Sequence, residues 1–187
     1  MRTNPSLTIL LLFMITCSSC SKISEDIKRD LIVTDSVDFE IPVLGSITDT
    51  TKTTTGIDIP LNLDKLNPDN TNNFSRENIS KIRISSFRMV LLESDTSVLK
   101  TTNFSNIQFI KAELVAGGRG QNFANVTNTS TSLVRSYNLP VSIPEDTAKK
   151  YLINPDVTYT FRYKARKTTT IPMKSRAYAT YTITLEK

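Results

Sequence analysis

Residues 157–165, Val-Thr-Tyr-Thr-Phe-Arg-Tyr-Lys-Ala, decide the fold. Apolar and aromatic side chains alternate in this segment with threonine, arginine and lysine, which is the period of two typical of a strand with one buried face. Residues 177–185 repeat the pattern, since alanine, tyrosine, isoleucine and leucine occupy every second position. We expect both segments to be strands, and we expect them to pair with each other as an antiparallel hairpin.

The same alternation recurs upstream of these two segments. It predicts strands at residues 31–43, 57–63, 81–93, 107–116, 133–137 and 139–143. Pro60 places the second of them at a sheet edge, and the change of apolar parity between Ile84 and Phe87 indicates a bulge.

Other segments lack this alternation. Residues 44–56 and the Asn-, Thr- and Ser-rich residues 121–132 are expected to be loops, the latter mobile. Pro144, followed by two acids and two lysines, predicts one short helix over 144–152. The fold class is therefore all-β, an antiparallel β-sandwich, Ig-like or jelly-roll-like, of about seven or eight strands.

Composition limits the chemistry that the protein can perform. The chain has no histidine, and its two cysteines are Cys17 and Cys20. Zinc or copper sites built from imidazole, and catalysis by Ser-His-Asp or Cys-His groups, are therefore excluded. An enzyme with this composition could use only paired carboxylates, a lysine base or a hydroxyl. We expect no enzymatic activity, no metal and no cofactor.

An apolar run of ten residues, 7–16, follows Arg2 near the start of the chain. It is too short to cross a bilayer as a helix, and it has the length of the apolar region of a secretory signal. A plain signal peptide and a buried N-terminal helix are the alternatives. A redox or metal pair at Cys17 and Cys20 would require a preceding strand, or a second pair for zinc.

Ser18-Ser19-Cys20 resembles the bacterial lipobox, where the signal is cut before a lipidated cysteine. The resemblance implies a signal peptide over 1–19, a diacylglyceryl thioether on Cys20 and an acylated amino end. The short, charged stretch that follows is expected to be a lipidated tether over 20–30, and the alternating segments predict a sandwich domain over 31–187. Cys17 is the rival lipid acceptor, but Thr16 before it is bulkier than Ser19.

The whole chain is similar to small lipoproteins of unknown function found in Bacteroidota. The matching parts are Ser19-Cys20-Ser21-Lys22, Thr147–Ile153, Tyr159–Lys167 and Tyr178–Leu185. The resemblance implies a lipid-anchored protein of the cell outer membrane, with the periplasmic and the surface-facing leaflet both open. It implies no chemistry.

Four residues are candidate contacts for an anion or a glycan. Alternation places Arg162, Lys164 and Arg166 on one strand face, where they would suit phosphates, anionic lipid or an acidic glycan. Tyr178 lies on the polar parity of the last strand, whereas most other tyrosines fall on the apolar parity and are expected in the core. A solvated strand face is the alternative, and nucleic acid is not an expected partner.

Two loops are further candidate sites. Residues 117–120, Gly-Gly-Arg-Gly, suit either an anion-binding nest or a turn that needs positive φ. Residues 64–72 carry oxygen ligands suited to calcium, or form a turn-rich linker.

These observations favour a lipid-anchored cell-envelope lipoprotein that is a non-catalytic binding or structural accessory in an envelope assembly. Its partners would be the membrane, through the anchor, and another envelope protein or a glycan. A surface glycan-binding module is the alternative. A glycan hydrolase using two carboxylates, such as Asp64 and Asp69, is less favoured.

Overall fold

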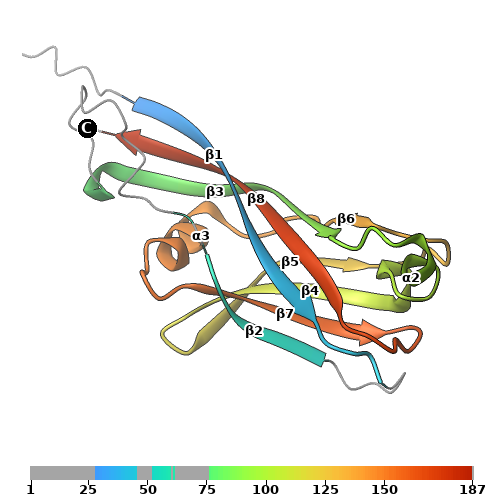
Figure 1. Cartoon of the computed structure of the whole chain (residues 1–187). Coiled ribbons are helices and arrows are strands. Elements are labelled where there is room, and N and C mark those ends of the chain that lie inside the picture. The colour runs from blue at the N-terminus through green and yellow to red at the C-terminus, as the bar shows by residue number, and fades with distance from the viewer. Residues whose placement is uncertain (1–27, 46–51, 60, 62–75, 187) are drawn as a thin grey trace, which may run out of the picture.

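The computed structural model describes residues 28–45, 52–59, 61 and 76–186, and these form two packed antiparallel sheets (Figure 1). Sheet A has the order β1-β8-β3-β6, and sheet B has the order β2-β7-β4-β5. The strands are β1 (Lys28–Ile41), β2 (Lys52–Asp58), β3 (Ile79–Leu91), β4 (Ile107–Ala116), β5 (Arg119–Thr127), β6 (Ser136–Asn138), β7 (Thr158–Ala165) and β8 (Met173–Glu186). The predicted all-β sandwich is confirmed.

The core lies between the two sheets and is rich in aromatic side chains. Tyr159, Phe161 and Tyr163 of β7 face inward and are buried, as are Phe87 of β3 and Tyr181 of β8. The ring of Phe87 lies 5.4 Å from that of Tyr159 and 5.9 Å from that of Phe161, centroid to centroid. Because each aromatic side chain buries about 150–250 Å², this cluster accounts for the strong period-two signal of β7.

The predicted hairpin between the last two strands is wrong. β8 pairs with β1 and β3 in sheet A, whereas β7 pairs with β2 and β4 in sheet B. The connecting residues 166–172 cross between the sheets and are held at both sides, since Arg166 N donates to Asn106 O at 2.6 Å and Thr169 N donates to Leu44 O at 3.0 Å. Crossing lets the two apolar rows bury each other across the core, whereas a hairpin would place them side by side on one sheet.

Several predicted boundaries shift. β1 begins at Lys28, so three residues assigned to the tether belong to the sandwich. β2 begins at Lys52, inside the predicted loop 44–56, and it is an edge strand as expected. The register of β3 against β8 shifts between Ile84 and Ser86, which confirms the predicted bulge.

The predicted mobile segment 121–132 is largely β5, which pairs with β4 from Ala116 opposite Arg119 to Phe109 opposite Thr127. Gly117 and Gly118 form the turn with φ of 55° and 73°, which confirms the positive-φ interpretation of this loop. Of the predicted short strands 133–137 and 139–143, the structure has only β6 and an isolated bridge from Val141 to Ala124.

Two α-helices occur in the described part of the chain, one more than predicted. α3 (Glu145–Leu152) is the expected helix, with Pro144 at its N-cap, and it packs against β3. α2 (Thr96–Thr101) was not foreseen. It begins where the Asp95 carboxylate accepts a hydrogen bond from Ser97 N at 2.8 Å and is followed by a 3-10 turn, η3 (Phe104–Asn106).

Candidate functional site

The cations predicted on one face of β7 make contacts within the protein. Arg162 Nε lies 2.8 Å from Glu113 Oε2, and Lys111 Nζ lies 2.6 Å from Glu113 Oε1. Burial of Glu113 opposes its charge, but hydrogen bonds from Lys111 and Arg162 outweigh that effect and lower the pKa of this carboxyl. This ion triplet gives Arg162 a role on the outer face of sheet B that needs no external anion.

Arg166 also has an internal role. Its two guanidinium amines donate to the main-chain oxygens of Asn128 and Ser130. Asn128 is buried, and its amide donates to Phe104 O at 2.8 Å and to Ile107 O at 2.9 Å. Arg166 therefore fastens the segment after β5 to the end of the sandwich.

Tyr178 lies on the other side of the molecule. It is on the outer face of sheet A, where β8 places it opposite Ser36 of β1 and Arg88 of β3. The Arg88 guanidinium lies 5.0 Å from the centre of the Tyr178 ring, a cation–π distance.

The four predicted contact residues therefore do not share a surface. Arg162, Lys164 and Arg166 belong to β7 and its continuation in sheet B, and Tyr178 belongs to sheet A. The expected grouping depended on the β7–β8 hairpin. Cys20, its rival Cys17 and the loop 64–72 lie outside the described residues.

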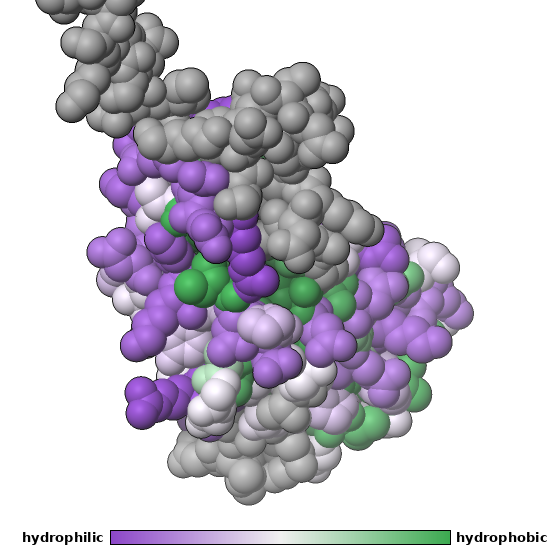
Figure 2. Space-filling model, turned by 90° about the vertical axis from the view of Figure 1, so that its left-hand side faces the viewer, coloured by the Kyte–Doolittle hydropathy of each residue, from purple (hydrophilic) through white to green (hydrophobic). Residues whose placement is uncertain are grey.

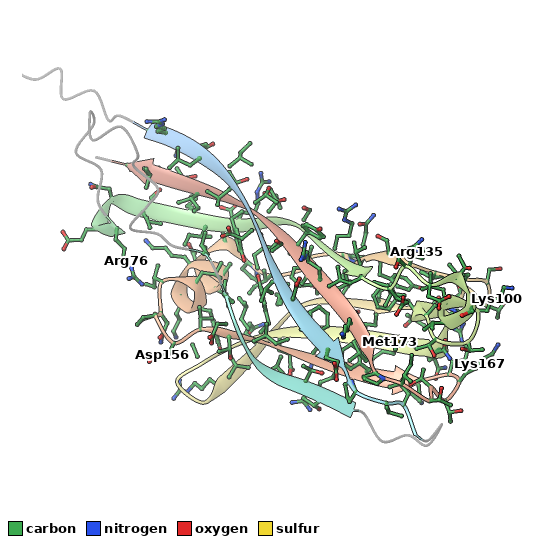
Figure 3. All side chains as sticks on the ribbon, viewed as in Figure 1. Arg76, Lys100, Arg135, Asp156, Lys167 and Met173 are labelled. Atoms are coloured by element: carbon green, nitrogen blue, oxygen red, sulfur yellow. The ribbon has the colours of Figure 1, made fainter. Side chains whose placement is uncertain are left out.

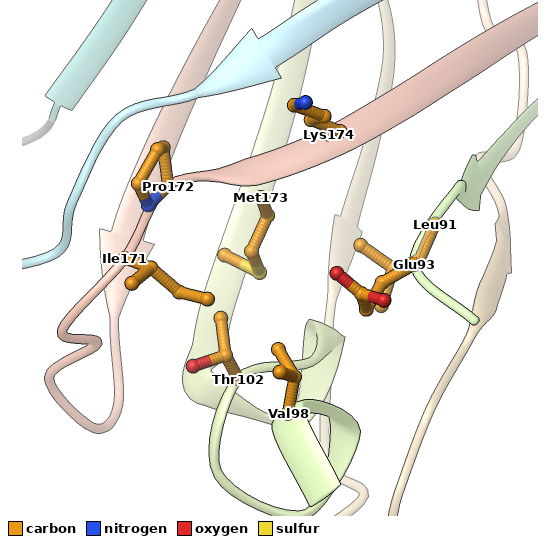
Figure 4. Close-up of a pocket in the computed structure, with 8 residues that line it drawn as sticks. All are labelled: Leu91, Glu93, Val98, Thr102, Ile171, Pro172, Met173 and Lys174. Atoms are coloured by element: carbon orange, nitrogen blue, oxygen red, sulfur yellow. The ribbon is translucent and has the colours of Figure 1, made fainter. Parts of the chain in front are cut away.

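A cavity of about 220 Å³ opens at the α2 end of the sandwich (Figure 4). Its walls are mostly apolar, and the residues that line it are Leu91, Glu93, Val98, Thr102, Ile171, Pro172, Met173 and Lys174. Glu93 directs its carboxylate toward the centre, whereas the Lys174 amine points away (Figure 4). The hydroxyl oxygen of Thr102 is buried and has no hydrogen-bond partner among the described residues.

The chemistry available in this cavity is limited. Glu93 Oε1 already accepts hydrogen bonds from Ser94 N at 2.8 Å and Asp95 N at 2.7 Å. The lining holds one carboxylate and no thiol or imidazole. Basic side chains stand around this end, including Lys100, Arg135 and Lys167 (Figure 3), and Arg135 Nη2 donates to Glu93 O at 2.8 Å. The lining is better suited to binding a small apolar group than to catalysing a reaction.

A shallow groove of about 290 Å³ lies at the opposite end, on the outer face of sheet A. Lys28 Nζ lies 2.6 Å from Glu186 Oε1, and Lys81 Nζ lies 3.8 Å from Glu145 Oε2. Figure 2 shows this end of the molecule, where hydrophilic side chains surround a central strip of hydrophobic ones. With Arg83, these lysines make three cations against the carboxylates of Asp30, Glu145 and Glu186, so the groove carries no net charge that would favour an anion.

The described residues contain no group of three or more acidic, histidine or cysteine side chains placed to hold a metal ion. No helix among them is long and apolar enough to cross a membrane.

Comparison with known proteins adds little. No family model matches the chain, and no curated protein matches it. Among solved structures, the crystal structure of a 60-mer BFDV capsid protein is similar with a TM-score of 0.36 and 11% sequence identity, over 88% of this chain and 96% of that chain.

Three features of the structure are not among the contacts predicted from the sequence. Asp35 occupies the apolar parity of β1, Glu113 pairs with Arg162, and Thr102 lines the cavity. Of these, the sequence itself indicates only Asp35, because it is a charged residue between Val33 and Val37 in a row that is otherwise apolar from Leu31 to Ile41.

Proposed function

We propose that the protein is a lipid-anchored lipoprotein of the cell outer membrane and a non-catalytic binding or structural accessory in an envelope assembly. The observation that carries the proposal is the apolar run 7–16 leading through Ser19 to Cys20, eight residues before the sandwich begins at Lys28. A lipid on Cys20 would attach the first strand of the domain directly to a membrane.

The short spacing fixes how far the sandwich can stand from the membrane. Eight extended residues span at most about 28 Å. Two or three acyl chains, at about 0.8 kcal/mol per buried methylene, make such an attachment effectively permanent. The sandwich would therefore work close to the membrane surface.

The hydrogen bonds and ion pairs of the carboxylates favour a binding role over catalysis. The chain lacks histidine, the Glu93 carboxylate is held by two main-chain amides, and Glu113 is neutralised by two cations. The Glu113 carboxylate is therefore a poor general acid or base, since its charged form is stabilised.

The anchor is tested by labelling cells with a palmitate analogue. The wild-type protein and the Cys17→Ala variant should incorporate the label and sediment with membranes, whereas Cys20→Ala should lose the label. Label that persists in Cys20→Ala, or that is lost only in Cys17→Ala, would contradict the assignment of Cys20.

The accessory role is tested by photocrosslinking in intact cells. A crosslinking amino acid at exposed positions of the two outer faces, such as Arg83 in sheet A and Asn125 in sheet B, should give a discrete adduct with another envelope component from at least one face. The absence of any adduct from a panel covering both faces would contradict the proposal.

A glycan-binding module is the second candidate, and the surroundings of Tyr178 favour it. The ring lies beside Arg88 on a sheet face rich in hydroxyls, where Thr34 contacts Thr180 at 3.1 Å and Ser85 contacts Thr182 at 2.7 Å, oxygen to oxygen. Aromatic rings and hydroxyls are groups that bind sugars. Binding to a glycan array that is lost in Tyr178→Ala and kept in Ser136→Ala would support this function, and an array without signal would remove it.

A further inference from the structure

β1 forms an open edge of sheet A. It pairs with β8 along all 14 of its residues without a register shift (Figure 1). On its other side, near its end, the Thr54 hydroxyl of β2 donates a hydrogen bond to Glu40 O at 3.2 Å. No described strand pairs with the outer edge of residues 28–36. Such an edge presents unpaired main-chain donors and acceptors to any incoming strand.

The side chains along this edge are less covered than their neighbours. Leu31, Val33 and Val37 point toward the core but are only partly buried, whereas Ile183 and Tyr181 beside them on β8 are fully buried. On the outer face, the side chain of Ile32 is 76% exposed, the largest value among the exposed large hydrophobic residues of the described chain. An added strand would cover both groups.

Asp35 lies in the same inward row, and no cation of the described residues pairs with it. Its Oδ2 atom is buried and accepts no hydrogen bond from the described residues. Behind it, the hydroxyls of Tyr159 and Tyr181 hydrogen-bond to each other. The β8 residues nearest it in this row are Ala177, Ala179 and Tyr181, so β8 supplies no positive charge beside it. Burial raises the pKa of Asp35, consistent with an uncompensated carboxylate.

We propose that two copies of the protein associate through their β1 strands, which pair antiparallel about a two-fold axis at Ile32 and join the two A sheets into one. Arg29 of each copy then lies opposite Asp35 of the other copy, in the inward row. Leu31 lies opposite Val33, and the two Ile32 side chains meet on the outer face. This one arrangement gives the Asp35 carboxylate a cation, pairs the open edge of β1 with a strand and covers the exposed Ile32 side chain.

The sequence of β1 selects this register. A two-fold axis normal to the sheet keeps every side chain on its own face, so the strand can shift only in steps that preserve parity. Centring the axis on Val33 would place Asp35 opposite Leu31. Centring it on Thr34 would place Asp35 opposite Val33 and Asp30 opposite Asp38, a like-charge pair that is destabilising. Only the Ile32 register gives Asp35 a cation.

The arrangement is compatible with an anchor on each copy, although it does not depend on one. Lys28 of one copy lies opposite Ser36 of the other, so the two strand starts are separated by eight positions, or about 26 Å along the ladder. Each eight-residue tether reaches about 28 Å. Both lipids can therefore enter the same membrane.

The register is tested by disulfide formation in the full-length protein, produced in cells and oxidised mildly before a non-reducing gel. Directly opposite residues have Cα atoms about 4.5–5.5 Å apart, which a disulfide can span. Ile32→Cys should therefore give a covalent dimer, and so should the double variant Asp30→Cys/Thr34→Cys. Thr34→Cys alone is the matched control and should not, because its two copies would be about 13 Å apart. Protein without an added cysteine gives the background.

The ion pair is tested in the Ile32→Cys background. Arg29→Asp, an exposed change, should lower the dimer yield about fivefold, because two cross-strand ion pairs become like-charge pairs. Adding Asp35→Arg to it should restore the yield. Equal yields from Ile32→Cys and Thr34→Cys, a yield for Ile32→Cys at background, or no recovery in the charge-exchanged protein would overturn the proposal. Native circular dichroism of each variant confirms that a lost dimer is not a lost fold.

Discussion

The α2 end of the sandwich and the β1 edge both bury polar atoms, but the two regions differ in how these atoms are hydrogen-bonded. At the α2 end, the Asn128 amide donates to two main-chain oxygens, and Asn103 and Asn106 form a capping box at η3. At the β1 edge, the Asp35 carboxylate has a buried oxygen that accepts no hydrogen bond from the described part of the chain. Buried polar groups are normally paired. The three asparagines at the α2 end therefore complete the fold, although the Thr102 hydroxyl there has no partner among the described residues. The unpaired group at the β1 edge is a carboxylate, and we take it to indicate a partner outside the chain.

The largest effect is expected from breaking the network at the α2 end. Asn128→Ala should lower the free energy of unfolding by about 2–4 kcal/mol, because the buried oxygens of Phe104 and Ile107 each lose a donor. Urea unfolding measures the loss. Asn125→Ala, an exposed change on β5, should stay within about 0.5 kcal/mol of the wild type, and equal losses in both variants would remove the contrast.

A smaller effect of opposite sign is expected at the β1 edge. Asp35→Val should raise the free energy of unfolding by about 1 kcal/mol at pH 7, because an apolar β-branched side chain replaces an unpaired carboxylate. Urea unfolding at protein concentrations too low for dimers measures it. Asp38→Val should lower stability slightly, because the exposed Asp38 carboxylate pairs with Arg176, with Nη2 and Oδ2 2.9 Å apart. Destabilisation by Asp35→Val would contradict the view that this carboxylate lacks a partner.

The smallest effect is a difference in pH dependence between Asp35 and Glu113. The pKa of Asp35 is raised on folding, so its charge destabilises the fold above that pKa, and the penalty disappears as the pH falls through it. The pKa of Glu113 is lowered, so its stabilisation is present above the ordinary pKa of glutamate and is lost as the pH falls toward the folded value. Stability curves from pH 7 to 3 measure both.

Two variants separate these contributions. The gap between the wild type and Asp35→Val should close first as the pH falls. The gap of about 1 kcal/mol between the wild type and Glu113→Gln should close only in stronger acid. A reversed order of closure would contradict the assigned pKa directions.

The sequence predicted where the strands lie in the chain better than it predicted which strands pair with each other. Alternation in 157–165 and 177–185 identifies the buried face of each strand, but it carries no information about which strand lies alongside. β5 was missed because its two buried residues, Phe123 and Ala124, are flanked by Gln121, Asn122 and Asn125, a composition typical of a loop. The pattern of apolar side chains does not reveal a strand such as β5, which is held mainly by main-chain hydrogen bonds to its hairpin partner.

The candidate contacts were predicted only in part for a similar reason. Parity correctly separated Tyr178 from the buried tyrosines Tyr159, Tyr163 and Tyr181. It could not show that Glu113, 49 residues away, would pair with Arg162, or that Arg166 would bind main-chain oxygens. Long-range partners of charged residues leave no local pattern in a sequence.

The intact mass of the protein purified from cell membranes tests the central claim most directly. The account predicts a chain that begins at Cys20 and carries the added mass of a diacylglyceryl group and an amide-linked acyl chain. A chain that retains residues 1–19, with no fatty acid on either cysteine, would contradict it.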